Sequence, residues 1–456
     1  MRKYDHYRHS GNEACPMLPK HWKIKKLRSI AYMKGRIGWQ NLRASEFTTE
    51  GPYLITGMNF KNGKIDWKEV YHITEERYNE APEIQLQVGD VLMTKDGTIG
   101  KLLYVDYLPD KASLNSHLLL FRPLGRDFLP KFLYYQLNSD LFQHHIELTK
   151  TGTTFFGITQ EAAGEYKMFL PTIDEQVSII HHLDKKIEQI DFCIDGKRNL
   201  IDLLNEEKAA IINNAVTKGI DETALMRLSG IEWLGDIPAH WQVKKIKHLT
   251  KISGRIGFRG YTNEDIVEAG EGAISLSPGN IKDNHLTLQQ TTYISWEKYH
   301  ESPEIKVEEG DVIFVKTGST IGKIALISQL IEPMTINPQL VIFKELSINN
   351  QFFYYFMQTK FIKSSLALNI FGGATPAINQ ETLNSLYVLV PSAEEQLKIV
   401  EHIQGTTRKI DNAVAKIEKE IELLTEYKTS LIYEVVTGKV KVDTLVEEPS
   451  EAQLAS

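Results

Sequence analysis

Two short glycine-flanked segments combine side chains that can recognise the edges of nucleic-acid bases. The first reads GRIGWQ at residues 35–40, and the second reads GRIGFR at residues 254–259. Arginine pairs well with guanine, and asparagine or glutamine with adenine. The alternative is a turn whose aromatic ring packs on the core. The segments therefore predict base-reading candidates at Arg36, Trp39, Gln40, Arg255, Phe258 and Arg259.

A second pair of segments can present backbone amides and lysines to the phosphates of DNA. They read KDGTIGK at residues 95–101 and KTGSTIGK at residues 316–323. Successive amides in a tight turn form a concave anion-binding site, and phosphate contacts position a protein on DNA. The predicted DNA-binding residues here are Lys95, Thr98, Lys101, Lys316, Ser319 and Lys323. A third pair of loops adds Thr153, Thr154 and Thr375 as candidates.

Several strings resemble catalytic motifs but lack residues that the chemistry requires. The GSTIGK string at 318–323 is one residue too short for a nucleotide-binding phosphate loop, and Ile324 replaces its hydroxyl residue. The NPQL string at 337–340 lacks the second proline and the aromatic residue of the amino-methyltransferase motif. The PEIK string at 303–306 resembles a nuclease motif, but the first half of the chain has Gln85 in place of the lysine. We therefore predict no catalytic residues and no cofactor in this chain.

The histidines and cysteines lack the spacing of a metal site. Two histidine pairs, at 144–145 and 181–182, are adjacent in sequence, so their side chains cannot share one face of a helix. Cys15 and Cys193 are the only cysteines, too few for a disulfide framework, which agrees with a reducing compartment. We predict no metal ligands.

The candidate segments occur in pairs because the chain contains an internal repeat. The LPKHW string at 18–22 matches IPAHW at 237–241, and the two GRIG strings follow at the same offset. Further pairs are PEI at 82–84 and 303–305, and Glu-Gln at 175–176 and 395–396. The spacing stays nearly constant, so two copies of one module cover almost the whole chain.

Each copy divides into a mixed domain and a helical end. Short β-rich runs, glycine-bearing turns and helix-like stretches predict a compact α+β domain. Apolar residues then recur at alternating steps of three and four, which predicts a coiled-coil helix. The predicted boundaries are 1–171 for the first α+β domain, 172–218 for the first spacer helix, 219–391 for a connector and the second α+β domain, 392–441 for the second spacer helix, and 442–456 for an acidic flexible tail.

A helix with one apolar stripe needs a partner, and the natural partner is the helix of the other copy. A helix of about 30 residues is roughly 45 Å long. Antiparallel packing holds the two modules at opposite ends with pseudo-two-fold symmetry, whereas parallel packing crowds them at one end. Lys208 and Lys428, at matching seam positions, either fix the register or lie at a fraying edge. We predict an antiparallel coiled coil.

The composition is that of a globular protein, and the charge is not that of a uniformly basic one. Of the 456 residues, 42% are hydrophobic and 24% are charged. The net charge of −7 argues against a wholly basic nucleic-acid binder but leaves room for a local basic face. An apolar signal sequence and a membrane-spanning stretch are both missing, so we expect a cytoplasmic location.

The run SGIEWLGDIPAHW at residues 229–241 is highly specific to one protein family. With VTKG at 216–219 and VTGK at 436–439 closing the two helices, it resembles the specificity subunit of type I restriction-modification systems, often called HsdS. The resemblance covers almost the full chain. The first copy departs from the pattern at residues 10–19, which lack the tryptophan and leucine, so its opening is expected to pack differently.

The resemblance implies a non-catalytic subunit that sets DNA sequence specificity. Each α+β domain is then a target-recognition domain, and the pair reads a bipartite, asymmetric site on double-stranded DNA. The implied partners are two methyltransferase (modification) subunits, which methylate adenine at N6, and two restriction (translocase) subunits where these exist. S-adenosylmethionine, ATP and Mg are expected on those partners and not on this chain.

The length of the two helices would then set the distance between the half-sites, which is expected to be about one turn of the DNA double helix, around 34 to 36 Å.

Two other classes of function stay open on the residues alone. A coiled-coil adaptor would bind proteins only, and salt-dependent, sequence-selective binding to duplex DNA would separate it from a specificity subunit. A self-sufficient methyltransferase or nuclease is the third, and the missing cofactor loop and metal cluster argue against it.

Overall fold

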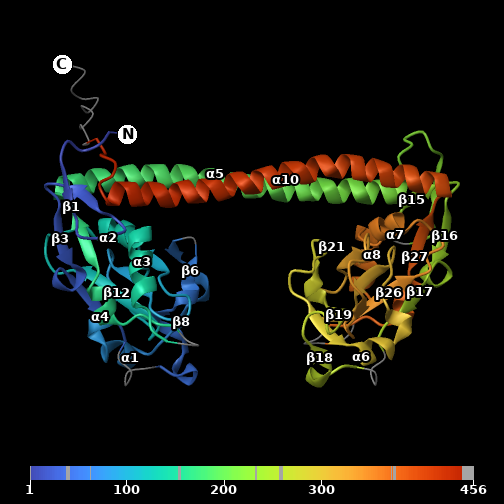
Figure 1. The fold of residues 1–456 in the computed structure, drawn as a ribbon, viewed down its shortest axis with the longest axis horizontal. Helices are drawn as coiled ribbons and strands as arrows, with labels where there is room; N and C mark the ends of the chain where they lie inside the picture. Colours follow the sequence, from blue (N-terminus) through green and yellow to red (C-terminus); the bar gives the residue numbers. More distant parts are fainter. Residues whose placement is uncertain are drawn as a thin grey trace, which may run out of the picture. The chain divides into compact units, whose positions relative to one another are not determined.

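The computed structural model describes residues 2–36, 42–61, 63–152, 156–231, 234–255, 260–370, 372 and 376–443. It divides into two compact units (Figure 1). Unit 1 comprises Met1–Lys197 with Glu418–Ser456, and unit 2 comprises Arg198–Ile417. Each unit therefore holds one mixed domain together with parts of both long helices. Most of the predicted acidic tail, residues 444–456, falls outside the described residues.

The mixed domain of unit 1, which we call the first module, contains two main sheets. One has the order β10-β9-β12-β4 and is antiparallel throughout; the other has the order β11-β5-β8, with β11 and β5 parallel. The strands of the first sheet are β4 (Ala31–Lys34), β9 (Val91–Thr94), β10 (Leu102–Tyr104) and β12 (Leu118–Pro123). Those of the second are β5 (Thr48–Ile55), β8 (Tyr71–His72) and β11 (Ala112–Leu114).

The second module, in unit 2, repeats this plan. Its sheets have the orders β17-β26-β23-β24 and β18-β22-β19-β25. The first sheet is built from β17 (Lys251–Ser253), β23 (Val312–Val315), β24 (Ile324–Leu326) and β26 (Leu340–Lys344). The second is built from β18 (Ile266–Val267), β19 (Gly272–Leu276), β22 (Thr292–Ser295) and β25 (Met334–Ile336).

The central strands are buried on both faces because two cores lie on either side of each four-stranded sheet. In β9, Val91 and Met93 join a core shared with the helices, whereas Leu92 joins a core shared with the second sheet. In β23, Val312 and Phe314 likewise join the core shared with the helices, whereas Ile313 joins the core shared with the second sheet. Side chains alternate between the faces of a strand, so these continuous apolar runs fit a sheet covered on both sides.

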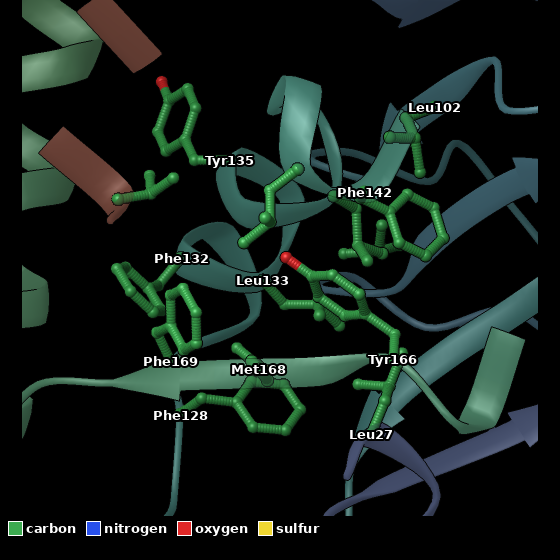
Figure 2. Close-up of a cluster of buried hydrophobic side chains, with 14 of the residues drawn as sticks. Leu27, Leu102, Phe128, Phe132, Leu133, Tyr135, Phe142, Tyr166, Met168 and Phe169 are labelled. Atoms are coloured by element: carbon green, nitrogen blue, oxygen red, sulfur yellow. The ribbon is translucent and has the colours of Figure 1, made fainter. Parts of the chain in front are cut away.

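Helices and a short sheet cover the outer face of each four-stranded sheet. Figure 2 shows Phe132, Leu133, Phe142, Met168 and Phe169 together in the resulting core of the first module. In that module the covering elements are β3 (Lys23–Lys26), α2 (Pro130–Leu137), α3 (Asp140–Thr149), α4 (Gln160–Gly164) and β13 (Lys167–Leu170). Their counterparts are β16 (Gln242–Lys245), α7 (Asn350–Phe356), α8 (Lys360–Ala367), α9 (Gln380–Ser385) and β27 (Tyr387–Val390).

Short elements complete the periphery of each module. In the first they are β1 (Tyr7–His9), β2 (Met17–Pro19), β6 (Phe60–Lys61), β7 (Lys64–Ile65) and α1 (Glu75–Asn79). In the second they are β14 (Met226–Leu228), β15 (Asp236–Pro238), β20 (Ile281–Lys282), β21 (His285–Leu286) and α6 (Trp296–His300). Across the described residues we find no helix with the length and apolarity needed to traverse a membrane.

The long helices α5 (Ile173–Lys218) and α10 (Ala393–Val436) pair within each unit. In unit 1, Lys428 binds Asp191 at 2.6 Å and Lys197 binds Glu420. The residue numbers therefore increase along one helix in the direction in which they decrease along the other. In unit 2, Lys208 binds Asp411 at 2.6 Å. The antiparallel pairing is as predicted. Lys208 and Lys428 make matching ion pairs to the opposite helix, which favours the register interpretation over the fraying edge.

The core of each unit contains the last turns of a helix from the other copy of the repeat. In unit 1, Leu431 and Val435 of α10 are buried in the same cluster as Phe132 and Phe169 of the first module. The side-chain amide of Gln136 also donates to the carbonyl oxygen of Val436, at 3.3 Å. In unit 2, the end of α5 contributes Ile212, Ala215 and Val216 to the core around Trp241 and Phe352. The unit boundaries therefore fall inside the helices.

A buried glutamine joins the start of each long helix to its own module. Gln176 accepts a hydrogen bond from the backbone N–H of Leu129 at 2.8 Å and donates to the carbonyl of Pro171 at 3.2 Å. Gln396 accepts from the N–H of Asn349 at 2.7 Å and donates to the carbonyl of Pro391 at 3.0 Å. These bonds explain why glutamine recurs at this place in the repeat.

The preceding glutamate contacts the repeated His-Trp string. His21 lies 3.0 Å from the carboxylate of Glu175. In unit 2, His240 lies 2.9 Å from the carboxylate of Glu395, which also accepts from the Trp241 indole N–H at 2.9 Å. Two motifs about 154 residues apart therefore meet at the start of each helix and fix it to the opening of its module.

We predict that Glu175 makes the stability of unit 1 depend on pH. Burial alone would raise the pKa of Glu175, but hydrogen bonds from His21 and Thr172 outweigh burial and lower the pKa. A lowered pKa stabilises the fold above the unfolded value, about 4.3 for glutamate, and this contribution is lost as the pH falls through the folded value. The difference in melting temperature between the native chain and Glu175→Gln should therefore shrink as the pH approaches 4.

The exposed Glu161→Gln serves as the control, since that side chain lies on the surface of α4. A gap between the native chain and Glu175→Gln that stayed constant from neutral pH to about pH 4 would contradict the assignment.

Candidate nucleic-acid interface

The structure brings the predicted DNA-binding segments of the first module side by side. The backbone N–H of Lys95 donates to the carbonyl of His117 at 2.9 Å, and the N–H of Ile158 donates to the carbonyl of Lys95 at 2.8 Å. Asp96 pairs with Gly157 in an isolated β-bridge. Segment 95–101 therefore lies between the turn that precedes β12 and the segment that precedes α4.

Gly35 joins the same surface. A Cβ atom at this position would lie 3.0 Å from the carbonyl oxygen of Leu118 and 3.7 Å from the Nζ atom of Lys95. A hollow of about 390 Å³ opens here, and its lining includes Gly35, Arg36, Lys95, Asp96 and Gln160. Segment 95–101 and the described residues at the ends of the other two candidate loops thus form one surface, which we call the recognition surface of the first module.

The second module forms the equivalent surface with the same backbone contacts. The N–H of Lys316 donates to the carbonyl of Gln339 at 2.9 Å, and the N–H of Ile378 donates to the carbonyl of Lys316 at 2.9 Å. Thr317 and Ala377 form an isolated β-bridge. Residues 316–323, 337–340 and 376–380 therefore correspond to 95–101, 115–118 and 156–160, and we call them the recognition surface of the second module.

Glycines shape the two lysine-containing turns. Gly97 and Gly100 have φ angles of +67° and +80°, and Gly318 and Gly322 have φ angles of +105° and +92°. Other residues rarely adopt this left-handed conformation, so glycine is required at these positions. The hydroxyl of Thr94 accepts from the N–H of Lys101 at 3.0 Å and closes the first turn. The repeated glycines therefore maintain the geometry of the two turns.

The side chains of the lysine-containing turns differ in exposure. Thr98, Lys101 and Ser319 are exposed, whereas Lys95, Lys316 and Lys323 are half-buried. Burial lowers the pKa of Lys316 below its ordinary value. Lys101 and Thr98 thus face solvent where a phosphate could approach, and their contact with DNA stays a prediction.

Arg36 and Arg255 lie inside their modules and not at the tips of loops. Arg36 is 3% exposed, and its guanidinium donates to the carbonyl of Leu114 at 2.8 Å and to the hydroxyl of Ser113 at 3.0 Å. Arg255 is 4% exposed and donates to the carbonyl of Ile336 at 3.1 Å and to Thr335 at 3.2 Å. In this structure both arginines therefore fix the start of the predicted base-reading loop to the neighbouring sheet.

Burial lowers the pKa of Arg36 to about 10, and that of Arg255 also falls. Both groups keep their positive charge at neutral pH, directly beneath the surface. Their contact with bases stays a prediction. The other candidates, Trp39, Gln40, Thr153, Thr154, Phe258, Arg259 and Thr375, lie outside the described residues.

Sequence reasoning missed two features of these surfaces. One is a side-chain contact in the first module, where the Nδ1 atom of His117 lies 2.6 Å from the carboxylate of Asp96. The other is a neighbouring turn at 56–59, whose buried Asn59 accepts from the N–H of Thr56 at 2.8 Å. The second module has the same turn, where Asn280 accepts from the N–H of Ser277 at 2.9 Å. In the sequence, the turn could have been found from the recurrence of a hydroxyl residue three positions before an asparagine.

Within the described part of the chain, histidine, cysteine and acidic side chains do not gather in groups of three or more that could hold a metal ion. Both cysteines are free, with Cys15 buried and Cys193 exposed.

Comparison with known proteins identifies the family of the chain. The family model of the type I restriction modification DNA specificity domain matches the chain twice, at residues 19–202 and 238–423. The chain belongs to this family. Each match covers one module and part of the helix that follows it, so the internal repeat is a repeat of the DNA specificity domain.

Curated relatives match over nearly their full length. The specificity subunit of the type I restriction enzyme MjaVIII from Methanocaldococcus jannaschii is 23% identical over 94% of this chain and 95% of its own. The specificity subunit of the type I restriction enzyme EcoKI from Escherichia coli is 19% identical over 95% and 92%. A solved structure described as the basis of complex assembly and conformational transition of the type I restriction-modification system has 14% identity, a TM-score of 0.66, and covers 93% of this chain and 99% of its own.

These findings settle the class of function that the residues alone left open. The chain is a DNA specificity protein with two recognition domains, which supports a role in specifying a bipartite site. Specificity subunits are the non-catalytic components of type I systems, so neither a protein-only adaptor nor a self-sufficient enzyme describes it. The two α+β modules are accordingly target-recognition domains.

We predict that Lys101→Ala and Lys323→Ala weaken binding to all duplexes alike. A lysine that contacts a phosphate contributes affinity but carries no sequence information. Each substitution should lower the slope of log affinity against log salt concentration by about 0.9, measured by titrating labelled duplexes at several salt concentrations. The matched control is Lys398→Ala, an exposed lysine on α10. A changed base preference, or an unchanged salt slope, would contradict a phosphate contact.

Proposed function

We propose that this chain selects the DNA target of a type I restriction-modification complex, with each module reading one half of a bipartite site. The observation that supports this proposal most directly is the duplication of the DNA specificity domain. Equivalent turns recur in the two modules on one backbone scaffold but with different polar side chains. Two equal scaffolds with unequal surfaces fit a site with two different half-sequences.

The partners that we propose are double-stranded DNA, two methyltransferase subunits, and two restriction subunits where the system has them. The relatives support these partners, since they are the specificity subunits of type I restriction enzymes. We propose that S-adenosylmethionine, ATP and Mg bind to those partners, and that this chain binds none of them. Its contribution to the complex is then the choice of sequence and a surface on which the other subunits dock.

The long helices offer apolar side chains for such docking. In unit 1, Phe192 of α5 is 82% exposed, and Leu423 and Tyr427 of α10 are 50% and 46% exposed. Large apolar residues on a helix normally face the core, and exposed apolar patches mark interaction sites. We assign these exposed side chains to the docking of a methyltransferase subunit, since that partner must be held beside the DNA whose sequence the modules select.

We predict that Phe192→Asp reduces copurification with the methyltransferase subunits. Because the side chain is exposed, the melting temperature of the free chain should barely change; surface substitutions usually alter stability by less than about 0.5 kcal/mol. Leu225→Asp is the matched control, because Leu225 is also 82% exposed but lies outside the helices. Full copurification of Phe192→Asp would place the docking surface elsewhere.

Exchanging one module tests the assignment of half-sites. Replacing residues 17–171 with the same region of a relative should change one half of the recognised site and leave the other half intact, because each recognition surface is built within one unit. The readout is a genome-wide map of methylated adenines with the native and the exchanged chain. A change in both halves at once would contradict the proposal.

Helix length as the determinant of the gap between half-sites remains our hypothesis. An insertion of about one helical turn, roughly four residues, near Leu204 of α5 should lengthen the unread gap without altering either half. The same map of methylated adenines gives the answer. An unchanged gap, or a changed half-site, would contradict the hypothesis.

A further inference from the structure

Two positions on the recognition surfaces correspond in structure but carry different chemistry. Asp96 and Thr317 each pair with the segment before the short helix, at Gly157 and Ala377 respectively. The backbone carbonyl of His117 accepts from the N–H of Lys95, and that of Gln339 accepts from the N–H of Lys316, at 2.9 Å in both modules. The first module therefore presents Asp96 and His117 where the second presents Thr317 and Gln339.

We propose that these positions read a base in each half-site, the first module selecting cytosine through Asp96 and the second selecting adenine through Gln339. This inference rests on the proposed function and names the residues that distinguish the two half-sites. It concerns residues 96 and 117 in one module and residues 317 and 339 in the other.

The chemistry of the first pair favours cytosine. The side chains of His117 and Asp96 are 63% and 35% exposed, so both can meet a ligand. With the Nδ1 atom of His117 at 2.6 Å from one carboxylate oxygen, the other oxygen of Asp96 can accept from the N4 amino group of cytosine, the usual partner of an acidic side chain in the major groove. Because phosphates repel a carboxylate, Asp96 is better suited to contact a base than the DNA backbone.

The chemistry of the second pair favours adenine. Gln339 is exposed, and the Oε1 atom of its side chain accepts from the side-chain amide of Asn337 at 3.3 Å. This bond orients the side-chain amide of Gln339. Asn337 also accepts from the backbone N–H of Gln339 at 3.0 Å and is itself buried. An oriented amide offers a donor and an acceptor together, which is the pattern that matches the N7 and N6 positions of adenine.

A purely structural role does not account for the contact between His117 and Asp96. The two turns that Asp96 and His117 connect are already joined by the backbone bond from Lys95 to His117. The second module keeps the same backbone bond with Thr317 and Gln339, which have neither a carboxylate nor an imidazole. The geometry of the turn is therefore independent of the Asp96–His117 contact, and the difference between the modules lies in what they present to a ligand.

The test exchanges the side chains between modules in the full-length chain. The native protein, Asp96→Thr with His117→Gln, and the reciprocal Thr317→Asp with Gln339→His are each used, with their methyltransferase subunits, to select duplexes from a pool of random sequence. The first variant should change one position of one half-site from cytosine to adenine, by about ten- to a hundredfold in preference. The reciprocal variant should change one position of the other half-site from adenine to cytosine. The control pair Asp106→Thr with His144→Gln, exposed residues outside the recognition surface, should leave both halves unchanged.

Unchanged half-sites in both exchange variants would overturn the inference, and so would weaker binding that is equal for all sequences. If one variant failed to fold, the reciprocal variant in the other module would decide by the same criterion. A native chain that selects no bipartite motif would instead refute the proposed function, so the two failures are distinguishable.

Discussion

Burial of two one-sided helices is the constraint on which the rest of this structure depends. Neither α5 nor α10 can bury its apolar stripe alone, and each is paired with the other within both units. The pairing does more than cover the stripes, because the last turns of α10 enter the core of the first module and those of α5 enter the core of the second. Each recognition domain is thus completed by residues from the other copy of the repeat.

This arrangement separates what must stay constant from what can vary. The buried glutamines at the helix starts, the glutamates that meet the His-Trp strings and the glycines of the lysine-containing turns recur in both modules, because they fix backbone geometry. The side chains at the surface of those turns differ. A type I specificity protein needs one scaffold that accepts different recognition residues. Here the contacting side chains of Asp96 and His117 in the first module and the amide of Gln339 in the second lie on equivalent turns.

The sequence was sufficient to predict the repeat, the two α+β modules and the antiparallel helices, because seam spacing and recurring motifs are visible in one dimension. It also named, as separate candidates, segments that the structure places beside one another, and their contact with DNA stays a prediction. It could not reveal that the guanidinium of Arg36 turns inward, since its partners at Ser113 and Leu114 lie far along the chain and come near only when β4 pairs with β12. The contact between Asp96 and His117 was hidden for the same reason, because it depends on the pairing of β9 with β12.

The most direct test of the account is hydrogen exchange in the full chain carrying Leu431→Ala and Val435→Ala at the end of α10. Substituting a buried leucine with alanine costs about 2–5 kcal/mol, so the first module should lose protection in α2 and β13, hundreds of residues away in the sequence. The equivalent elements of the second module, α7 and β27, should keep theirs. Loss of protection confined to α10, or appearing first in the second module, would contradict the claim that each recognition domain is closed by the helix of the other copy.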